Sequence, residues 1–266
     1  MRGTVDGLVL REVAVGESDK LITVLTAPYG KILISAKGVR SMKNKNLPVC
    51  RLFTYGNFEF YEKGGKRWLA SGSVNDNFFG LNSDIESFAL AAYIVEIAGE
   101  ISGEGVAADE LLRMTLNTLY AIQNKLKPMS LIKAAYELYA ASLSGFEPDV
   151  SGCRECWEPF PDEAYLDVMN GAFVCQSCMS KSRAGQMGIP EVDKFEARNI
   201  FLPINAPVLA ALRYLMSAPI SRAFAFELRD EGDMLDLSRL GETYLQHHLE
   251  RGFESLTFLK AVCDKI

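Results

Sequence analysis

Four of the six cysteines lie in two pairs whose spacing suits a metal ion. Two residues separate the cysteines of each pair, and eighteen residues separate the pairs, which gives the pattern CxxC-x18-CxxC. This spacing is typical of four-cysteine zinc ribbons. The sequence therefore predicts one zinc ion whose ligands are Cys153, Cys156, Cys175 and Cys178.

The segment between the two pairs predicts a hairpin. Asn170-Gly171 lies between two apolar runs, and Asn-Gly favours a two-residue type I′ turn that would bring the second pair back to the first. Four thiolates leave no open coordination position, whereas a catalytic zinc needs one, so we expect the zinc to be structural. Dithiol redox chemistry at either CxxC motif is the alternative.

The rest of the chain shows no catalytic motif. It contains no GxxxxGK[ST] phosphate loop, no GxGxxG and no GxSxG. His247 and His248 are far along the chain from the cysteines and are interpreted as a surface or boundary pair, and Cys50 and Cys263 as packing residues. We therefore expect no enzyme and no catalytic residue.

The net charge of −6 conceals an uneven distribution. Residues 1–80 hold 12 basic and 7 acidic residues, and residues 81–266 hold 16 and 27. No acid occurs from Lys31 to Arg51, and a second basic group follows at residues 63–67. Basic segments of this kind bind polyanions, although a solvated charged face is the ordinary alternative. The candidate phosphate-binding residues are Lys37, Arg40, Lys43, Lys45, Arg51, Lys63, Lys66 and Arg67.

The basic residues lie among five expected strands, at 3–15, 21–26, 31–36, 52–61 and 68–74. Five short strands with glycine-containing turns predict a small closed barrel, with an OB-fold favoured over an SH3-like barrel. Residues 37–46 would be a flexible loop of that barrel. Nucleic acid follows a basic groove on OB-folds while aromatic rings stack on bases. Strand alternation buries about half of the rings, so none can be selected among Tyr29, Phe53, Tyr55, Phe58 and Tyr61.

From residue 82 the apolar period becomes helical. Helices are expected from a Ser83 or Asp84 cap to 101, at 111–126 and 128–143, and then at 191–200, 206–217, 220–228 and 238–263. Phe201–Pro203 would be a linker. The predicted fold is a multidomain α+β protein with an OB-fold domain at 1–80, a helical domain at 81–149 and 181–266, and a zinc ribbon inserted at 150–180. The longest uncharged segment, 199–212, contains two prolines, so we expect no membrane span and a cytoplasmic location.

This order of domains, together with several short motifs, resembles the RecO family of bacterial recombination mediators. In the barrel the motifs are Gly7-Leu-Val-Leu10, Gly16-Glu-Ser-Asp19 and Ala36-Lys-Gly-Val-Arg40. Farther along they are Gly145-Phe-Glu-Pro148 and the two cysteine pairs. Many members have glycine after the second cysteine, where this chain has Trp157.

The resemblance implies a non-enzymatic role in the RecF-type pathway of DNA repair. Members bind single- and double-stranded DNA, anneal complementary strands and associate with RecR. They also contact single-strand-binding protein, through the helical part, which helps the RecA recombinase to load; a nucleoid-associated location follows. Lys37 and Arg40 lie in a matching motif. Two alternatives stay open: an RNA-binding factor with the same two modules, and a scaffold that binds only protein.

Overall fold

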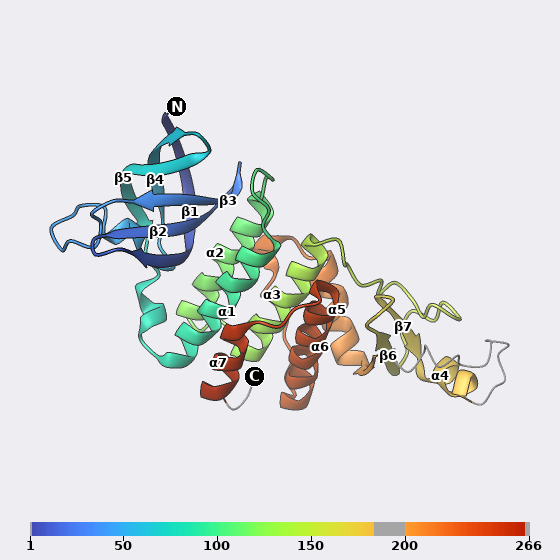
Figure 1. Ribbon diagram of the computed structural model, residues 1–266. Coiled ribbons are helices and arrows are strands. Elements are labelled where there is room, and N and C mark those ends of the chain that lie inside the picture. Colours follow the sequence, from blue (N-terminus) through green and yellow to red (C-terminus); the bar gives the residue numbers. More distant parts are fainter. Residues whose placement is uncertain (1, 184–199, 264–266) are drawn as a thin grey trace. The chain divides into compact units, whose positions relative to one another are not determined.

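The computed structural model describes residues 2–183 and 200–263. The described chain forms two compact units, one from residues 2–126 and 253–263 and the other from residues 127–183 and 200–252. Figure 1 shows the order of the elements along the chain. Among the described residues, none of the helices has the length and hydropathy needed to cross a bilayer.

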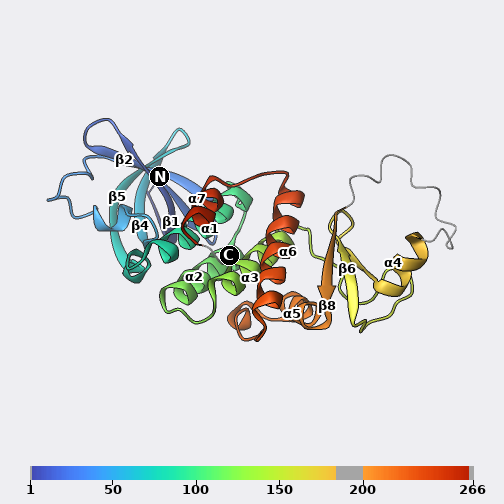
Figure 2. The ribbon, with the colours of Figure 1, turned by 90° about the horizontal axis from the view of Figure 1, so that it is seen from below.

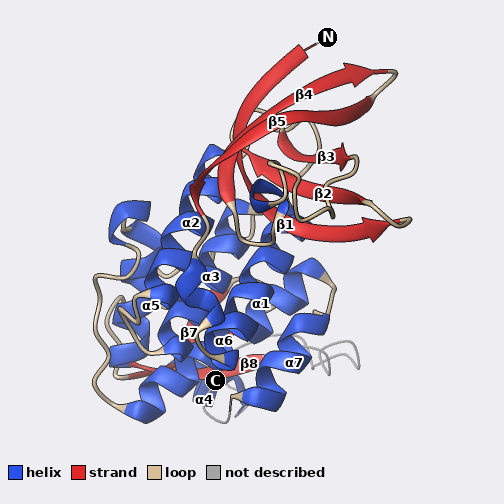
Figure 3. Cartoon of the chain, turned by 90° about the vertical axis from the view of Figure 1, so that its left-hand side faces the viewer, coloured by secondary structure: helices blue, strands red, loops and turns tan. Residues whose placement is uncertain are grey.

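The first unit begins with a closed five-stranded barrel, seen side-on in Figure 3. Strands β1 (Arg2–Val15), β2 (Asp19–Thr26), β3 (Gly30–Ala36), β4 (Tyr55–Lys63) and β5 (Lys66–Asp76) follow the order β1-β2-β3-β5-β4 around it. Alternating side chains such as Val9, Ile22, Ile34 and Phe58 fill the interior, as the period of two requires. The predicted OB-type barrel is confirmed.

Glycine is required at one corner of the barrel. Gly30 begins β3 with a φ of +62°, and a Cβ atom there would lie 2.1 Å from the carbonyl oxygen of Gly103. The backbone of the barrel thus approaches the chain that follows α1 too closely for any side chain.

Helices α1 (Ile85–Ile101), α2 (Asp109–Gln123) and α7 (Glu254–Val262) complete the first unit. Of the two predicted caps, Ser83 and Asp84, the cap is Asp84, whose carboxylate accepts a hydrogen bond from the N–H of Ser87 at 2.7 Å. Helix α1 is buried on most sides, and its Tyr93 packs edge-to-face on Phe253. Helix α7 therefore packs on α1 although about 150 residues separate them in sequence.

The second unit combines helices with a small sheet. Helix α3 (Met129–Leu143) packs on α6 (Glu231–Leu249), and α5 (Ala206–Ser217) packs on both. Strands β6 (Glu163–Asp167), β7 (Ala172–Cys175) and β8 (Phe201–Asn205) form a sheet in the order β7-β6-β8, and α4 (Gln176–Arg183) follows β7 (Figure 2). Fully buried Lys133 of α3 forms ion pairs with Glu137 of the same helix at 3.1 Å and with Glu242 of α6 at 3.0 Å.

Three sequence predictions for the C-terminal part are wrong. Phe201–Pro203 belongs to β8, not to a linker. Residues 220–228 form only a short 3-10 turn at Ile220–Arg222. The helix predicted at 238–263 is two helices, α6 and α7, because Glu250 adopts a left-handed φ of +50° that ends α6. The helix expected at 191–200 falls, except for Ile200, outside the described residues.

Candidate metal centre and nucleic-acid interface

The four cysteines converge at one end of the small sheet. Cys153 and Cys156 lie in the loop before β6, Cys175 ends β7, and Cys178 lies in α4. The four Sγ atoms are all within 4.8 Å of one another, and those of Cys156 and Cys175 are 3.7 Å apart. A tetrahedral zinc ion with bonds of about 2.3 Å places its sulfurs about 3.8 Å apart. The cluster therefore has the donor atoms and the spacing that a metal ion needs.

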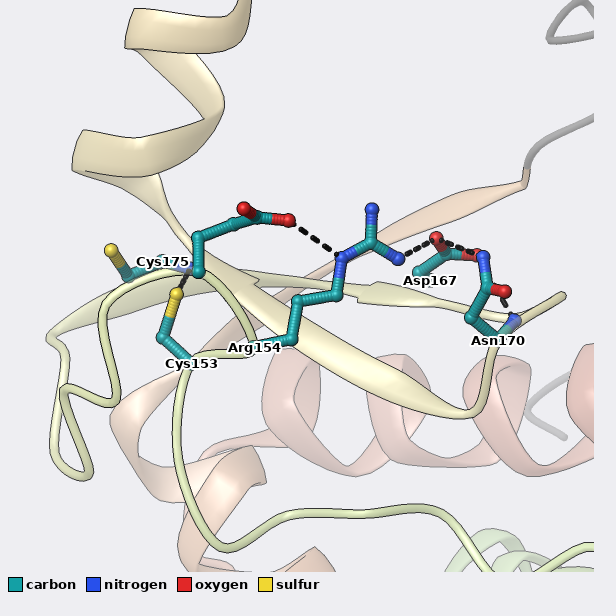
Figure 4. Close-up of polar contacts among 6 residues, drawn as sticks. Cys153, Arg154, Asp167, Asn170 and Cys175 are labelled. Atoms are coloured by element: carbon teal, nitrogen blue, oxygen red, sulfur yellow. Dashed lines mark hydrogen bonds and ion pairs between the residues drawn. The ribbon is translucent and has the colours of Figure 1, made fainter. Parts of the chain in front are cut away.

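Backbone amides favour a thiolate at Cys153. Burial raises the pKa of this thiol, but hydrogen bonds from the backbone N–H groups of Cys175, Glu155 and Cys156 outweigh it and lower the pKa to about 7. The N–H of Cys175 lies 3.3 Å from the Cys153 Sγ (Figure 4). Burial and the neighbouring thiols raise the pKa of Cys178. Without a cation, the surroundings thus favour the thiolate at Cys153 but oppose it at Cys178. A bound cation would stabilise the thiolates together, because metal-binding cysteines are deprotonated.

A buried carboxylate holds the hairpin that brings the pairs together. Asp167, which is fully buried, accepts a 2.5 Å hydrogen bond from Arg154 and a 2.8 Å bond from the Asn170 side chain (Figure 4). Strand pairing ends at Asp167↔Ala172, so four residues form the turn, and of these Gly171 has a φ of +60°. The hairpin is confirmed, but the two-residue type I′ turn is wrong, because the Asp167 clamp stabilises a longer loop.

The first cysteine pair closes with a left-handed turn. Trp157 has a φ of +63° and donates its N–H to the carbonyl oxygen of Cys153 at 2.7 Å. Glycine adopts this conformation without steric cost, which gives a physical reason for glycine at this position. The chain keeps the turn with a tryptophan whose side chain is exposed.

The basic loop of the barrel is anchored by the carboxylate of Asp19 and by uncharged groups of the loop itself. The N–H of Gly38 donates to Asp19 at 2.7 Å, a bond that holds the pKa of Asp19 below its usual value. Asn44 donates to the carbonyl oxygen of Gly38 at 2.9 Å, and Val39 is buried. These bonds give residues 37–46 a defined path along the barrel.

The anchoring leaves most basic side chains of this loop exposed. Lys37, Lys43 and Lys45 point outward, and in the described structure neither Lys43 nor Lys45 takes part in an ion pair or hydrogen bond. Arg40 is exposed as well, although its guanidinium donates to the carbonyl oxygen of Gly16 at 3.0 Å. The loop therefore presents concentrated positive charge to solvent and is joined to the β1–β2 turn.

The remaining predicted basic residues differ in their surroundings. Lys63 and Lys66 are exposed on either side of the β4–β5 turn, and Arg51 is exposed after the short 3-10 helix at Pro48–Cys50. Arg67 instead forms ion pairs with Glu62 at 3.6 Å and Glu104 at 3.1 Å. Its charge is already partly neutralised, so it is the weakest of the eight candidates.

The structure also separates the aromatic candidates. Phe53 and Phe58 are buried in the protein. Tyr55 is half-buried, whereas Tyr29 and Tyr61 are 47% and 52% exposed. Sequence reasoning did not consider Trp68, which pairs with Tyr61 across strands β4 and β5. Side chains alternate between the two faces of β5, and Leu69 packs on the barrel core, so the neighbouring Trp68 faces outward. This alternation was the sequence pattern that could have identified Trp68.

Cys50, His247 and His248, for which the sequence predicts no chemical role, are buried or half-buried. Cys50 is buried in the barrel core, where burial raises the pKa of its thiol to about 12. His247 and His248 are both half-buried in α6, and the ring of His248 stacks on Phe146. Neither histidine belongs to the cysteine cluster.

Comparison with known sequences now decides the family. The family described as "Recombination protein O N terminal" matches residues 1–78, and the one described as "Recombination protein O C terminal" matches residues 82–257. The chain belongs to the RecO family. The boundary between the two matches falls after β5 and before α1, so the RecO N-terminal region coincides with the barrel.

Individual RecO relatives match along most of the chain. The DNA repair protein RecO of Acetivibrio thermocellus is 26% identical over 98% of this chain and 96% of its own length. That of Anaeromyxobacter dehalogenans is 29% identical over 98% and 97%. That of Listeria welshimeri is 30% identical over 70% and 72%.

Proposed function

We propose that this protein is a non-enzymatic recombination mediator in DNA repair. It binds single- and double-stranded DNA through the barrel and anneals complementary strands. With RecR it helps RecA to load onto single strands covered by single-strand-binding protein, in the cytoplasm at the nucleoid. The proposal is supported by membership of the RecO family and by relatives named DNA repair protein RecO.

The observation that carries the DNA-binding part is the charge of the loop at residues 37–46. Its backbone is held by Asp19, Asn44 and buried Val39, while its lysine side chains face solvent without acidic partners nearby in sequence. Because the loop backbone already has a defined path, binding to phosphates orders only the lysine side chains, and it releases counterions from the DNA.

We further propose a division of labour along the chain. Residues 1–80 bind DNA, the helices within residues 81–149 and 181–266 contact protein partners, and residues 150–180, whose sheet is completed by β8, form a ribbon stabilised by one zinc ion. When bound, zinc would cross-link Cys153, Cys156, Cys175 and Cys178. It would provide no reactive centre, because four thiolates fill its coordination. The Asp167 clamp orients the hairpin that carries Cys175.

DNA binding and annealing by the purified protein over a salt series test this function. We expect binding to single strands and duplexes that weakens linearly on a log–log plot, and faster pairing of complementary strands. Equal-length ribo- and deoxyribo-oligonucleotides are compared in parallel. Preference for RNA would contradict the DNA assignment, and lack of binding to either at low salt would contradict the nucleic-acid role altogether.

A further inference from the structure

The register of the barrel strands places one row of side chains across its outer surface. Tyr61 of β4 lies opposite Trp68 of β5, Trp68 is aligned with Ser35 of β3, and Ser35 lies opposite Leu21 of β2. Direct cross-strand partners lie on the same face of a sheet. The neighbours Phe60, Leu69, Ile34 and Ile22 pack in the barrel core. Since strand side chains alternate, the row faces outward.

The rings of this row are accessible. Tyr61 is 52% exposed and Trp68 is half-buried. On the same outward face, two residues before Ser35 on β3, Leu33 is 51% exposed. The guanidinium of Arg2 lies 5.8 Å from the centre of the Tyr61 ring and is held by an ion pair with Glu59 at 2.5 Å. Tyr61 is thus ordered by its neighbours and still presents ring surface to solvent.

Positive charge sits directly beside the two rings. Lys63 and Lys66 are the next-but-one residues along β4 and β5, and they lie opposite each other across the strands. Like charges in direct cross-strand positions repel and destabilise a hairpin. Both lysines are exposed. An arrangement that repels in the free protein becomes favourable when an anion lies between the ammonium groups.

We propose that Tyr61 and Trp68 form a stacking platform for bases of single-stranded DNA, with Lys63 and Lys66 holding the adjoining phosphates. This inference rests on the proposed DNA-binding function and adds the chemical basis for recognising unpaired bases. Aromatic rings stack on any base, whereas the bases of a duplex are stacked on each other and are not available. The platform therefore contributes to single-strand affinity and not to duplex affinity.

The two tryptophans of the chain allow a direct test of base contact. Trp157 and Trp68 are the only ones, so the variant Trp157→Phe leaves Trp68 as the sole tryptophan. We expect oligo(dT) to quench the fluorescence of Trp68, and an abasic oligonucleotide of equal charge to bind without comparable quenching. Anisotropy of a labelled oligonucleotide confirms that binding has occurred. Bound oligo(dT) that leaves the Trp68 emission unchanged would overturn the platform.

Substitution of Tyr61 gives an independent test. Loss of one stacked base corresponds to about 5- to 160-fold weaker binding. We expect Tyr61→Ala to lose single-strand affinity within that range and to keep its duplex affinity, and Tyr61→Phe to bind like the wild type. Tyr120→Ala is the matched control, since Tyr120 is a similarly exposed tyrosine that lies in α2, outside the barrel.

The outcomes separate the two levels of the proposal. Equal losses for single strands and duplexes in Tyr61→Ala, or an equal loss in Tyr120→Ala, would refute the platform and leave barrel binding intact. Wild-type protein that binds no DNA at low salt would instead refute the proposed function. Circular dichroism of each variant verifies that the barrel is folded, and the Trp68 fluorescence measurement applies even if Tyr61→Ala is unstable.

Discussion

Removing the two freest charges of the basic loop gives a quantitative prediction. Lys43 and Lys45 are exposed and, within the described structure, take part in no ion pair. If each contacts one phosphate, each contributes about −0.7 to the log–log salt slope with single strands and about −0.9 with duplexes. The variant Lys43→Ala/Lys45→Ala should therefore flatten the slope by about 1.4 and about 1.8, respectively.

The same reasoning gives the loss of affinity. Extrapolated to 1 M salt, where counterion release contributes nothing, the variant and the wild type should bind alike. At 0.1 M salt a slope change of about 1.4 corresponds to roughly 25-fold weaker single-strand binding, and one of about 1.8 to roughly 60-fold weaker duplex binding. Fluorescence anisotropy between 0.05 and about 0.5 M salt measures both quantities.

Two comparison variants make this result specific. Lys181→Ala/Arg229→Ala changes the net charge equally at exposed positions outside the barrel, and its slope should stay at the wild-type value. Arg67→Ala should change the slope less than a single loop lysine does, because Arg67 is paired with Glu62 and Glu104. A Lys43→Ala/Lys45→Ala variant with an unchanged slope, or a Lys181→Ala/Arg229→Ala variant with the same loss, would refute the reasoning.

Three further predictions concern the second unit. Purified protein should contain one zinc ion per chain by elemental analysis. The variant Cys175→Ser should lose both the zinc and thermal stability, because a structural zinc contributes about 10 kcal/mol or more of folding free energy. Full zinc content in the variant would contradict the site. Trp157→Gly should raise the free energy of unfolding by about 0.5–1 kcal/mol in urea titrations, because its φ of +63° strains a non-glycine residue; a marked loss would contradict this. Burial, reinforced by His247, lowers the pKa of His248 below its unfolded value of about 6.5. The contribution of neutral His248 to the free energy of unfolding should therefore be complete above that pH and should be lost as the pH falls through the folded pKa. The variant His248→Gln should reduce this pH dependence. An unchanged pH profile in that variant would argue against the assignment.

Local patterns were sufficient for the barrel and for the ligands of the metal centre. Strand alternation and glycine-containing turns predicted five strands close to the observed ones. The spacing of the cysteine pairs identified four sulfurs that the fold does bring together. In both cases the pattern is formed by residues close in sequence, so it can be recognised in one sequence without a structure.

Features that depend on distant partners were not visible in the sequence. Strand β8 exists because it pairs with β6, and Pro203 is accommodated because β8 lies at an edge of the sheet. The turn of the hairpin depends on the side chain of Asp167, which overrides the usual preference of Asn-Gly. Pairing of Tyr61 with Trp68 likewise depends on the register of β4 and β5.

Chemical footprinting of lysines tests the assignment of DNA to the barrel most directly. The wild-type protein is acetylated with and without a saturating single strand at low salt, and the modified lysines are quantified by mass spectrometry. We expect DNA to protect Lys43, Lys45, Lys63 and Lys66 and to leave Lys181 of α4 as reactive as before. Protection of Lys181 with unchanged reactivity of the four barrel lysines would contradict the account.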